Sequence, residues 1–188
     1  MLVIDWQDFL ENGLPLNGRL SSMTVGIFDG VHLGHQELLK CVTSHSFDKY
    51  APVVVTFRQN HKTLEQTGIQ SFEQRLEQFE KLGIQITIVI DFTEEFRLMP
   101  GIKFLEILLK HGSVGFIAIG SDFRCGRQLD TDAKMIHGFF ASCGIPAEIV
   151  PEVTEGSLPI SSSRIRTAIA AGDFSLAEKM LGRAYLPG

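Results

Sequence analysis

The chain has 188 residues, a formal net charge of −5 and 44% hydrophobic residues, which suits one soluble globular domain with a hydrophobic core. An acidic chain lacks the positive field that nucleic-acid binding requires, and no apolar run approaches the roughly 20 residues of a membrane-spanning helix. The three cysteines are far apart and form no CxxC pair, which argues against a disulfide framework or a zinc site and favours a reducing cytoplasm.

Apolar runs of strand length alternate with helical patterns along the chain. The run PVVVTF (52–57) is rich in β-branched residues and apolar on both faces, as a strand covered on both sides should be. The segment 71–83 has apolar residues at helical spacing, with Ser71 as N-cap and Gly83 as C-cap. The expected strands span 23–28, 52–57, 85–91, 114–120 and 147–153, and the expected helices span 35–45, 71–83, 101–112, 131–144, 162–172 and 175–182.

This alternation predicts an α/β fold, in one domain that spans residues 1–188. We expect a Rossmann-like, doubly wound parallel sheet of about five strands with helices on both faces. In such sheets, ligands bind beyond the carboxyl ends of the strands, where the strand order reverses. The tips after the first, second and fourth strands, and the turn into the helix at 162–172, are therefore the segments where a site is expected.

The tip after the first strand reads GIFDGVHLGH and leads into a helix. Gly26 permits close approach to the backbone, Gly30 permits a positive φ, and Gly34 leaves room at the helix start. A helix N-terminus favours a phosphate, and His32 and His35 can both point over it, where a phosphoryl oxygen would favour protonated imidazole. The lack of an obvious third ligand argues against zinc. The alternative is a polar turn whose histidines cap backbone groups.

The turn into the late helix reads ISSSRIR. Its serines can cap the helix or donate hydroxyl groups to a phosphate. Ser162 and Arg166 are four residues apart and share a helix face, so Arg166 is a candidate fork donor for a polyphosphate. Arg164 lies on a different face. The alternative is a capped helix with solvated arginines. The segment indicates a phosphate site only in combination with HLGH.

Together, these segments resemble a known family. HLGH is similar to the HxGH signature of nucleotidylyltransferases, and ISSSRIR is similar to their late ISSTxIR motif. Over about 24–185, the sequence resembles the FMN adenylyltransferase module of bacterial FAD synthetases. The segments that carry this resemblance are, in order, FDGVHLGHQELL, GSDFRCGRQLDTD, ISSSRIR and AGDFSLAEKMLGRAY. The resemblance implies that FMN attacks the α-phosphorus of ATP to give FAD and pyrophosphate, with Mg²⁺ held mainly by the phosphates and no metal ligands from the protein.

The resemblance also implies roles for individual residues. His32, His35 and Arg166 would be the catalytic residues, which hold the phosphates and offset their charge. Because both histidines are expected on a surface tip, replacing either with Ala is expected to leave the fold intact. The ATP site would comprise Gly26, Phe28, Asp29, Gly30, His32, Gly34, His35, Ser162, Ser163 and Arg166, and the flavin site would comprise Phe57, Asp122, Phe123, Arg124, Gly126 and Arg127.

The sequence departs from the family pattern in three segments. TFRQNHKTL (56–64) lacks the two prolines of the family's TFxPHP, Cys125 stands where a phenylalanine is expected, and RQLDTD lacks a glycine. The first departure puts flavin affinity in question. Many relatives continue after LGRxY into a riboflavin kinase domain, whereas this sequence reads LGRAYLPG, so we expect no phosphorylation of riboflavin.

Two alternative functions remain open beside FAD synthesis. The first is a flavin-nucleotide-binding module without turnover, which the altered TFRQNH segment favours. The second is a nucleotidylyltransferase with a different phosphate acceptor, such as a pantetheine phosphate, against which the GSDFRCG segment argues. In each case the expected partners are small-molecule nucleotides.

Overall fold

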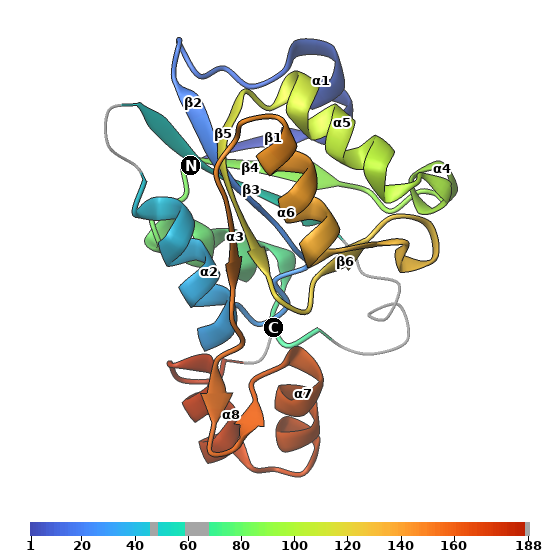
Figure 1. Ribbon diagram of the computed structural model, residues 1–188. Coiled ribbons are helices and arrows are strands. Elements are labelled where there is room, and N and C mark those ends of the chain that lie inside the picture. The colour runs from blue at the N-terminus through green and yellow to red at the C-terminus, as the bar shows by residue number, and fades with distance from the viewer. Residues whose placement is uncertain (46–48, 59–67, 187–188) are drawn as a thin grey trace.

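A six-stranded sheet forms the centre of the molecule (Figure 1). The computed structural model describes residues 1–45, 49–58 and 68–186. All neighbouring strand pairs in this sheet are parallel, so the fold class is α/β, as predicted, with one strand more than expected. The strands are β1 (Leu2–Asp5), β2 (Leu20–Val25), β3 (Tyr50–Phe57), β4 (Ile86–Ile90), β5 (Val114–Gly120) and β8 (Ala147–Val150), in the order β1-β4-β3-β2-β5-β8.

The strand order reverses at β2. Strands β3, β4 and the edge strand β1 lie on one side of β2, and β5 and β8 lie on the other side. Because all these strands are parallel, the carboxyl ends of β2, β3 and β5 meet at the same edge. This edge is where a ligand site is expected in a doubly wound sheet.

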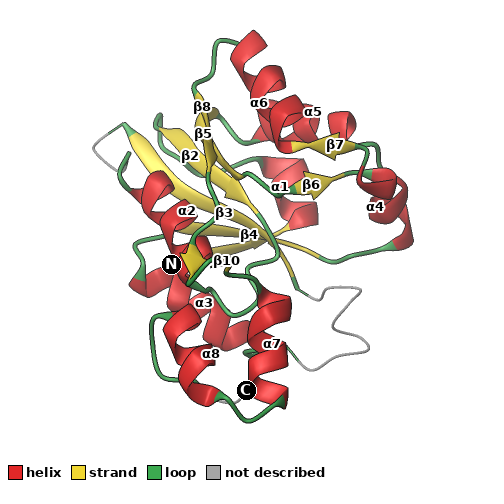
Figure 2. Ribbon diagram, turned by 60° about the horizontal axis from the view of Figure 1, so that its bottom comes forward, coloured by secondary structure: helices red, strands yellow, loops and turns green. Residues whose placement is uncertain are grey.

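Helices cover both faces of the sheet (Figure 2). One buried cluster joins α1, α5 and α6 to one face through Phe9, Phe104 and Phe140, and a second joins α2 and α3 to the other face through Leu39 and Phe79. The helices are α1 (Trp6–Asn12), α2 (Leu33–Thr43), α3 (Phe72–Lys81), α4 (Glu94–Leu98), α5 (Gly101–His111), α6 (Ala133–Ser142), α7 (Ser162–Ala170) and α8 (Phe174–Leu181).

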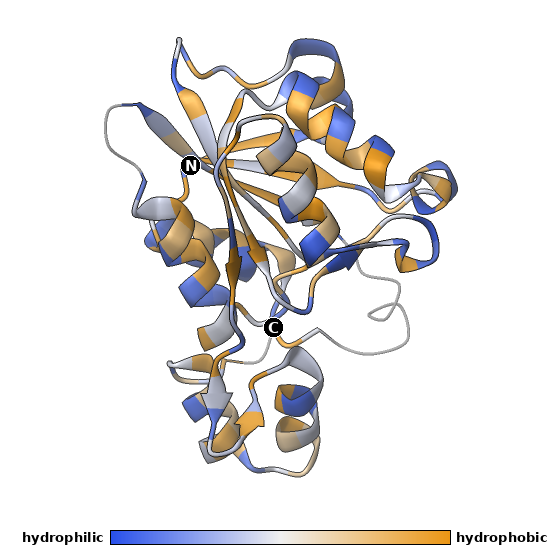
Figure 3. Cartoon of the chain, in the orientation of Figure 1, coloured by the Kyte–Doolittle hydropathy of each residue, from blue (hydrophilic) through white to orange (hydrophobic). Residues whose placement is uncertain are grey.

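Strand β3 illustrates why the strands are apolar throughout. Val53 and Val55 join the cluster with α1, α5 and α6, whereas Val54 joins the cluster with α2 and α3. Successive side chains of a strand point to opposite faces, and here both faces are covered. Figure 3 shows the resulting concentration of hydrophobic residues in the strands. Burial of each such side chain contributes about 1.5–3 kcal/mol.

Helices α7 and α8 form a separate unit at the carboxyl side of the sheet (Figures 1 and 2). Ile165, Ala177 and Met180 belong to a third buried cluster, distinct from the two clusters on the sheet. The antiparallel pair β9 (Thr154–Glu155) and β10 (Leu158–Pro159) leads into this unit.

A second antiparallel pair lies between β5 and α6. It consists of β6 (Arg124–Cys125) and β7 (Thr131–Asp132), with a short 3-10 helix, Arg127–Leu129, between the two strands. This pair carries part of the segment that the sequence analysis assigned to flavin binding.

Several elements differ from the sequence-based expectation. The elements β1, α1 and α4 were not predicted, and the last strand ends at Val150 rather than at residue 153. The first expected strand, 23–28, instead spans Leu20–Val25, because Phe28 has a left-handed φ of 56° that no strand accommodates. Over the described ranges, none of the helices is long and apolar enough to cross a membrane.

Candidate functional site

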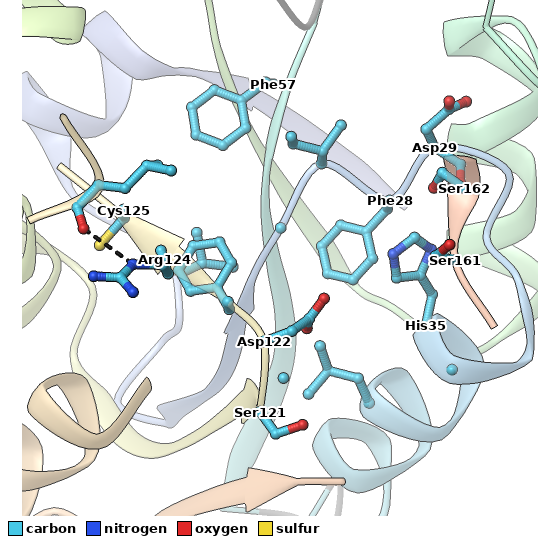
Figure 4. A pocket seen from close by; sticks show the side chains of 18 of the residues that line it. Phe28, Asp29, His35, Phe57, Ser121, Asp122, Arg124, Cys125, Ser161 and Ser162 are labelled. Carbon is cyan, nitrogen blue, oxygen red and sulfur yellow. Dashed lines mark hydrogen bonds between the residues drawn. The ribbon is translucent and has the colours of Figure 1, made fainter. Parts of the chain in front are cut away.

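A cavity of about 580 Å³ opens at the carboxyl edge of the sheet, where the strand order reverses (Figure 4). Its walls come from the end of β3, from the segments that follow β2, β4, β5 and β8, and from the starts of α2 and α7. Of the expected ATP-site residues, Gly30 alone is not part of the lining. The others line the cavity together: Gly26, Phe28, Asp29, His32, Gly34, His35, Ser162, Ser163 and Arg166.

The residues expected to bind the flavin line another part of the same cavity. Figure 4 shows Arg124 and Cys125 across the cavity from His35 and Ser162. The lining includes Phe57, Asp122, Phe123, Arg124 and Gly126. Arg127 is not part of the lining; its backbone N–H donates to the Met99 carbonyl at 2.9 Å.

An aromatic wall that the sequence analysis did not include completes this part of the cavity. Phe92 and Phe96 line it beside Phe57, whose ring centroid lies 5.7 Å from that of Phe92 and 5.6 Å from that of Phe96. Phe96 belongs to α4, which has five residues and is too short for a periodicity argument. The spacing of four between two phenylalanines, directly after an expected strand, is the signal that could have identified this wall.

The turn between β2 and α2 contains three residues in the left-handed region. The φ angles are 56° for Phe28, 82° for Gly30 and 38° for Val31. Glycine adopts this conformation without strain, whereas for bulky Phe28 and β-branched Val31 it is costly and must be enforced by the surroundings. Gly26 is required for another reason: a Cβ there would lie 2.9 Å from the Phe28 ring.

Side chains from distant segments bond the carbonyl groups of this turn. The Arg75 guanidinium, only 7% exposed, donates to the carbonyl of Ile27 and also to the carbonyls at the end of β3. The Arg183 guanidinium donates to two carbonyl groups further along the turn, those of Gly30 at 2.6 Å and Val31 at 3.1 Å. Sequence reasoning missed both arginines as site residues, although the LGRAY segment containing Arg183 was part of the resemblance.

His32 is both a cap of α2 and a wall of the cavity. Its Nδ1 accepts a hydrogen bond from the His35 backbone N–H at 3.3 Å, so neutral His32 carries its proton on Nε2. The expectation that His32 lies on a surface tip is wrong, because His32 is buried, with only 6% of its surface exposed. The two imidazole rings are stacked, with centroids 3.6 Å apart.

Both histidines are neutral near pH 7 in the absence of a ligand. Burial, and then the charge of Arg183, lowers the pKa of His32 from 6.5 to about 4. Burial, followed by the charges of His32 and Arg75, holds the pKa of His35 well below its usual value. His35 Nδ1 is buried and has no hydrogen-bond partner among the described residues. Protonation near pH 7, as expected beside a phosphate, therefore requires an anion that raises these pKa values when it enters the site.

Asp29 and Arg166 form an ion pair at the edge of the cavity. The other carboxylate oxygen of Asp29 accepts from the Ile69 backbone N–H at 3.0 Å. Arg166 also donates to Ser163 Oγ at 3.3 Å, and Ser162 Oγ donates to the Asp29 carbonyl at 2.8 Å. Helix α7 is therefore fixed directly to the turn after β2, with the Arg166 guanidinium at the cavity wall.

The site contains anion-binding groups but offers no metal cluster of its own. Both oxygens of Asp29 are engaged, and across the part of the chain that the structure describes, no group of three His, Cys, Asp or Glu side chains could hold a metal ion. The starts of α2 and α7 add helix N-termini beside His35 and Arg166. One end of the cavity is thus suited to phosphates, and the aromatic end is suited to a flat ring system.

A protein-family model described as FAD synthetase matches residues 16–164. This chain belongs to the FAD synthetase family. It is 31% identical over 173 residues to the bifunctional riboflavin kinase/FMN adenylyltransferase of Bacillus subtilis, covering 88% of this chain and 54% of the relative. It is 28% identical over 170 residues to the protein of the same name from Escherichia coli, covering 87% of this chain and 54% of the relative. The chain therefore spans about half the length of these bifunctional relatives.

Two further similarities concern a shorter relative and a solved structure. The chain is 27% identical over 175 residues to an FAD synthetase of Listeria monocytogenes, covering 90% of this chain and 71% of the relative. A crystal structure described as a macrolide-efflux protein from Streptococcus pneumoniae has a TM-score of 0.85 and 28% identity, covering 98% of this chain and 63% of that one. The similarity supports the same fold along nearly the whole chain.

The departures of this FAD synthetase family member from the family pattern have structural consequences. Leu129 stands where the resemblance implies a glycine, and its φ of 58° is a conformation that glycine adopts without strain. Cys125 is partly buried at the cavity wall, and burial raises the pKa of its thiol to about 12. The altered part of TFRQNHKTL after Arg58 lies outside the described residues.

Proposed function

We propose that this chain is an FMN adenylyltransferase, which transfers AMP from ATP to FMN and releases pyrophosphate. The observation that carries the proposal is that one cavity brings two sets of groups together. His32, His35 and Arg166, from α2 and α7, line one part of it, and Phe57 and Phe96 line another part. A triphosphate needs the first set of groups, and an isoalloxazine ring needs the second. Membership of the FAD synthetase family supports the same assignment.

In this proposal, the triphosphate of ATP lies over the start of α2. The Nε2–H of His32 donates to a phosphoryl oxygen, and His35, whose Nδ1 has no partner among the described residues, is available to a second oxygen. The negative charge of the phosphates then favours protonation of the imidazoles, which places positive charge where pyrophosphate leaves. Arg166, held by Asp29 and Ser163, adds a fixed guanidinium at the same end.

The transfer itself needs no covalent enzyme intermediate. A phosphate oxygen of FMN forms a bond to the α-phosphorus of ATP, the bond from that phosphorus to the bridging oxygen breaks, and pyrophosphate leaves with the electron pair. The chain contributes orientation and charge stabilisation. The described residues offer no cluster of three metal ligands, so the phosphates would hold Mg²⁺, which would supply additional charge neutralisation when bound.

Chromatographic detection of products tests this function. The chain is incubated with FMN, ATP and Mg²⁺, and the expected product is FAD together with pyrophosphate. Binding of FMN without FAD formation would instead indicate a flavin-nucleotide-binding module. A parallel mixture contains a pantetheine phosphate in place of FMN, and its turnover is not expected. A mixture with riboflavin in place of FMN determines whether the chain also phosphorylates riboflavin. The cytoplasmic location inferred from the cysteine pattern stays a prediction.

A further inference from the structure

We propose that Arg183 is a positioning residue for His32, acting through the backbone of the turn between β2 and α2. Arg183 follows α8, lies outside the cavity lining and is separated from the turn by about 150 positions in the sequence. The kinetic part of this proposal rests on the proposed function, whereas its structural part concerns the ligand-free chain.

The contacts of Arg183 hold two consecutive peptide units, Gly30–Val31 and Val31–His32. Its Nη2 donates to the Gly30 carbonyl at 2.6 Å and to Gln70 Oε1 at 2.8 Å, and its Nη1 donates to the Val31 carbonyl at 3.1 Å. A guanidinium is planar, so bonds to these two carbonyls fix the peptide units on either side of the Val31 Cα relative to each other. Gly30, Val31 and Gln70 are not part of the cavity lining, so Arg183 acts from outside it.

The turn needs such a constraint because its backbone is strained. Val31 has a φ of 38°, which a β-branched residue adopts only where surrounding contacts enforce it. Gln36 Nε2 donates to the same Val31 carbonyl at 2.9 Å and to the Leu181 carbonyl at 2.8 Å. Donors from α2 and from the segment after α8 therefore act together on one strained residue.

The next residue along the chain is His32. Its backbone is extended, its Nδ1 caps α2 through the His35 N–H, and its ring is stacked on that of His35. A rotation of the preceding peptide would therefore displace both imidazoles at the phosphate end of the cavity. The charged groups that act on this ring pair are Arg183, which acts on His32, and Arg75, which acts on His35.

The local sequence LGRAY explains how Arg183 reaches the turn. Gly182 ends α8 with a left-handed φ of 68°, which redirects the chain toward α2. A Cβ on Gly182 would lie 2.5 Å from the Leu33 side chain, which would have to shift, and any side chain at this φ would be strained. Leu181 is buried in the cluster of α7 and α8. This segment thereby couples the packing of the α7–α8 unit to the histidine pair.

Three variants of the full chain test the proposal. Arg183→Met removes both the charge and the donors, whereas Arg183→Lys keeps the charge but loses the planar fork. The matched control is Arg164→Met: Arg164 also donates to three backbone carbonyls, those of Glu155, Leu158 and Pro159, and it does not line the cavity. Each variant is examined by thermal unfolding, by NMR titration of the His32 imidazole without ligand, and by kcat and KM for FAD formation.

We expect the two methionine variants to lower Tm by similar amounts and to differ in the other readouts. Arg183→Met should raise the pKa of His32 from about 4 toward 6.5 and lower kcat by about 10²-fold, as small displacements of a catalytic group do. Arg164→Met should leave both at wild-type values. Arg183→Lys should keep the His32 pKa low because the charge remains, whereas loss of the fork should shift the imidazole signals of His32 and His35 in the ligand-free NMR spectrum and lower kcat.

Imidazole signals of His32 and His35 in ligand-free Arg183→Lys that match those of the wild type would overturn the proposal, because this variant keeps the charge and loses the fork. If Arg183→Met does not fold, a wild-type kcat in Arg183→Lys would also overturn it. If the wild type forms no FAD, the proposed function fails, and the ligand-free NMR spectra of Arg183→Lys still decide the role of Arg183 because they do not depend on turnover.

Discussion

Replacement of His32 by asparagine separates its role as the cap of α2 from its proposed role in binding phosphates. Asparagine is among the best N-cap residues, so His32→Asn should still cap α2, and the free energy of unfolding should change by less than about 1 kcal/mol. The variant lacks the Nε2–H that, in the proposed function, donates to a phosphoryl oxygen. Loss of one such donor from a water-poor site typically lowers kcat by about 10²- to 10³-fold.

His32→Ala should show the same loss of kcat and an additional loss of stability. Without a side-chain acceptor, the His35 backbone N–H loses its partner, which costs about 1 kcal/mol. Asp5→Ala is the matched control, because Asp5 caps α1 through the Asp8 backbone N–H at 2.9 Å and does not line the cavity. This control should lose similar stability and keep its kcat.

The assay measures FAD formation at saturating ATP and FMN, together with urea unfolding of each variant. A wild-type kcat in His32→Asn would refute the assignment of His32 to the phosphates. Equal losses of kcat in His32→Ala and Asp5→Ala would show that helix capping alone, and not the imidazole, determines the rate.

Further predictions concern stability, pH and cysteine reactivity. Asp29→Ala removes the acceptor of the buried Ile69 N–H and the carboxylate that pairs with Arg166, so it should lower the free energy of unfolding by about 1–3 kcal/mol in urea titrations. The control Asp91→Ala breaks an exposed ion pair and should cost less than about 1 kcal/mol. Because burial lowers the pKa of His32 from 6.5 to about 4, the unfolded chain binds a proton in this window that the folded chain does not. The free energy of unfolding should therefore fall by about 3 kcal/mol as the pH drops to 4, and His32→Asn should lack this part of the loss. Iodoacetamide at about pH 8 should modify exposed Cys143 before Cys125, whose thiol stays protonated, as peptide mass spectrometry would show.

Local sequence patterns predicted the parts of the fold that bury a regular apolar face. The run at 52–57 and the helix that begins after Ser71 are examples, since burial and capping act within a few residues. Strand β1 escaped prediction because it is an edge strand: Leu2 is 46% exposed and Val3 is 44% exposed, so no alternation marks it. Pairing with β4 across more than 80 residues is what makes this segment a strand.

The candidate site was predicted where its residues are adjacent in sequence, and missed where distant segments complete it. HLGH and SSSRIR identified residues that line one cavity. The arginines that hold the turn act on backbone carbonyls, which look alike at every residue, so no pattern around the turn indicates Arg75 or Arg183. Their roles follow from the fold that brings them there.

The carbonyl bonds of the turn also set an order for assembling the protein. The sheet and its two clusters use residues up to Val150, but the turn is held by Ser162 and Arg183 as well. During synthesis from the N-terminus, the sheet can therefore form while the turn still lacks these partners. We expect a nascent chain that ends before residue 183 to have a folded core and a loose histidine pair, so that nucleotide affinity appears only after Arg183 has been synthesised and has folded onto the turn.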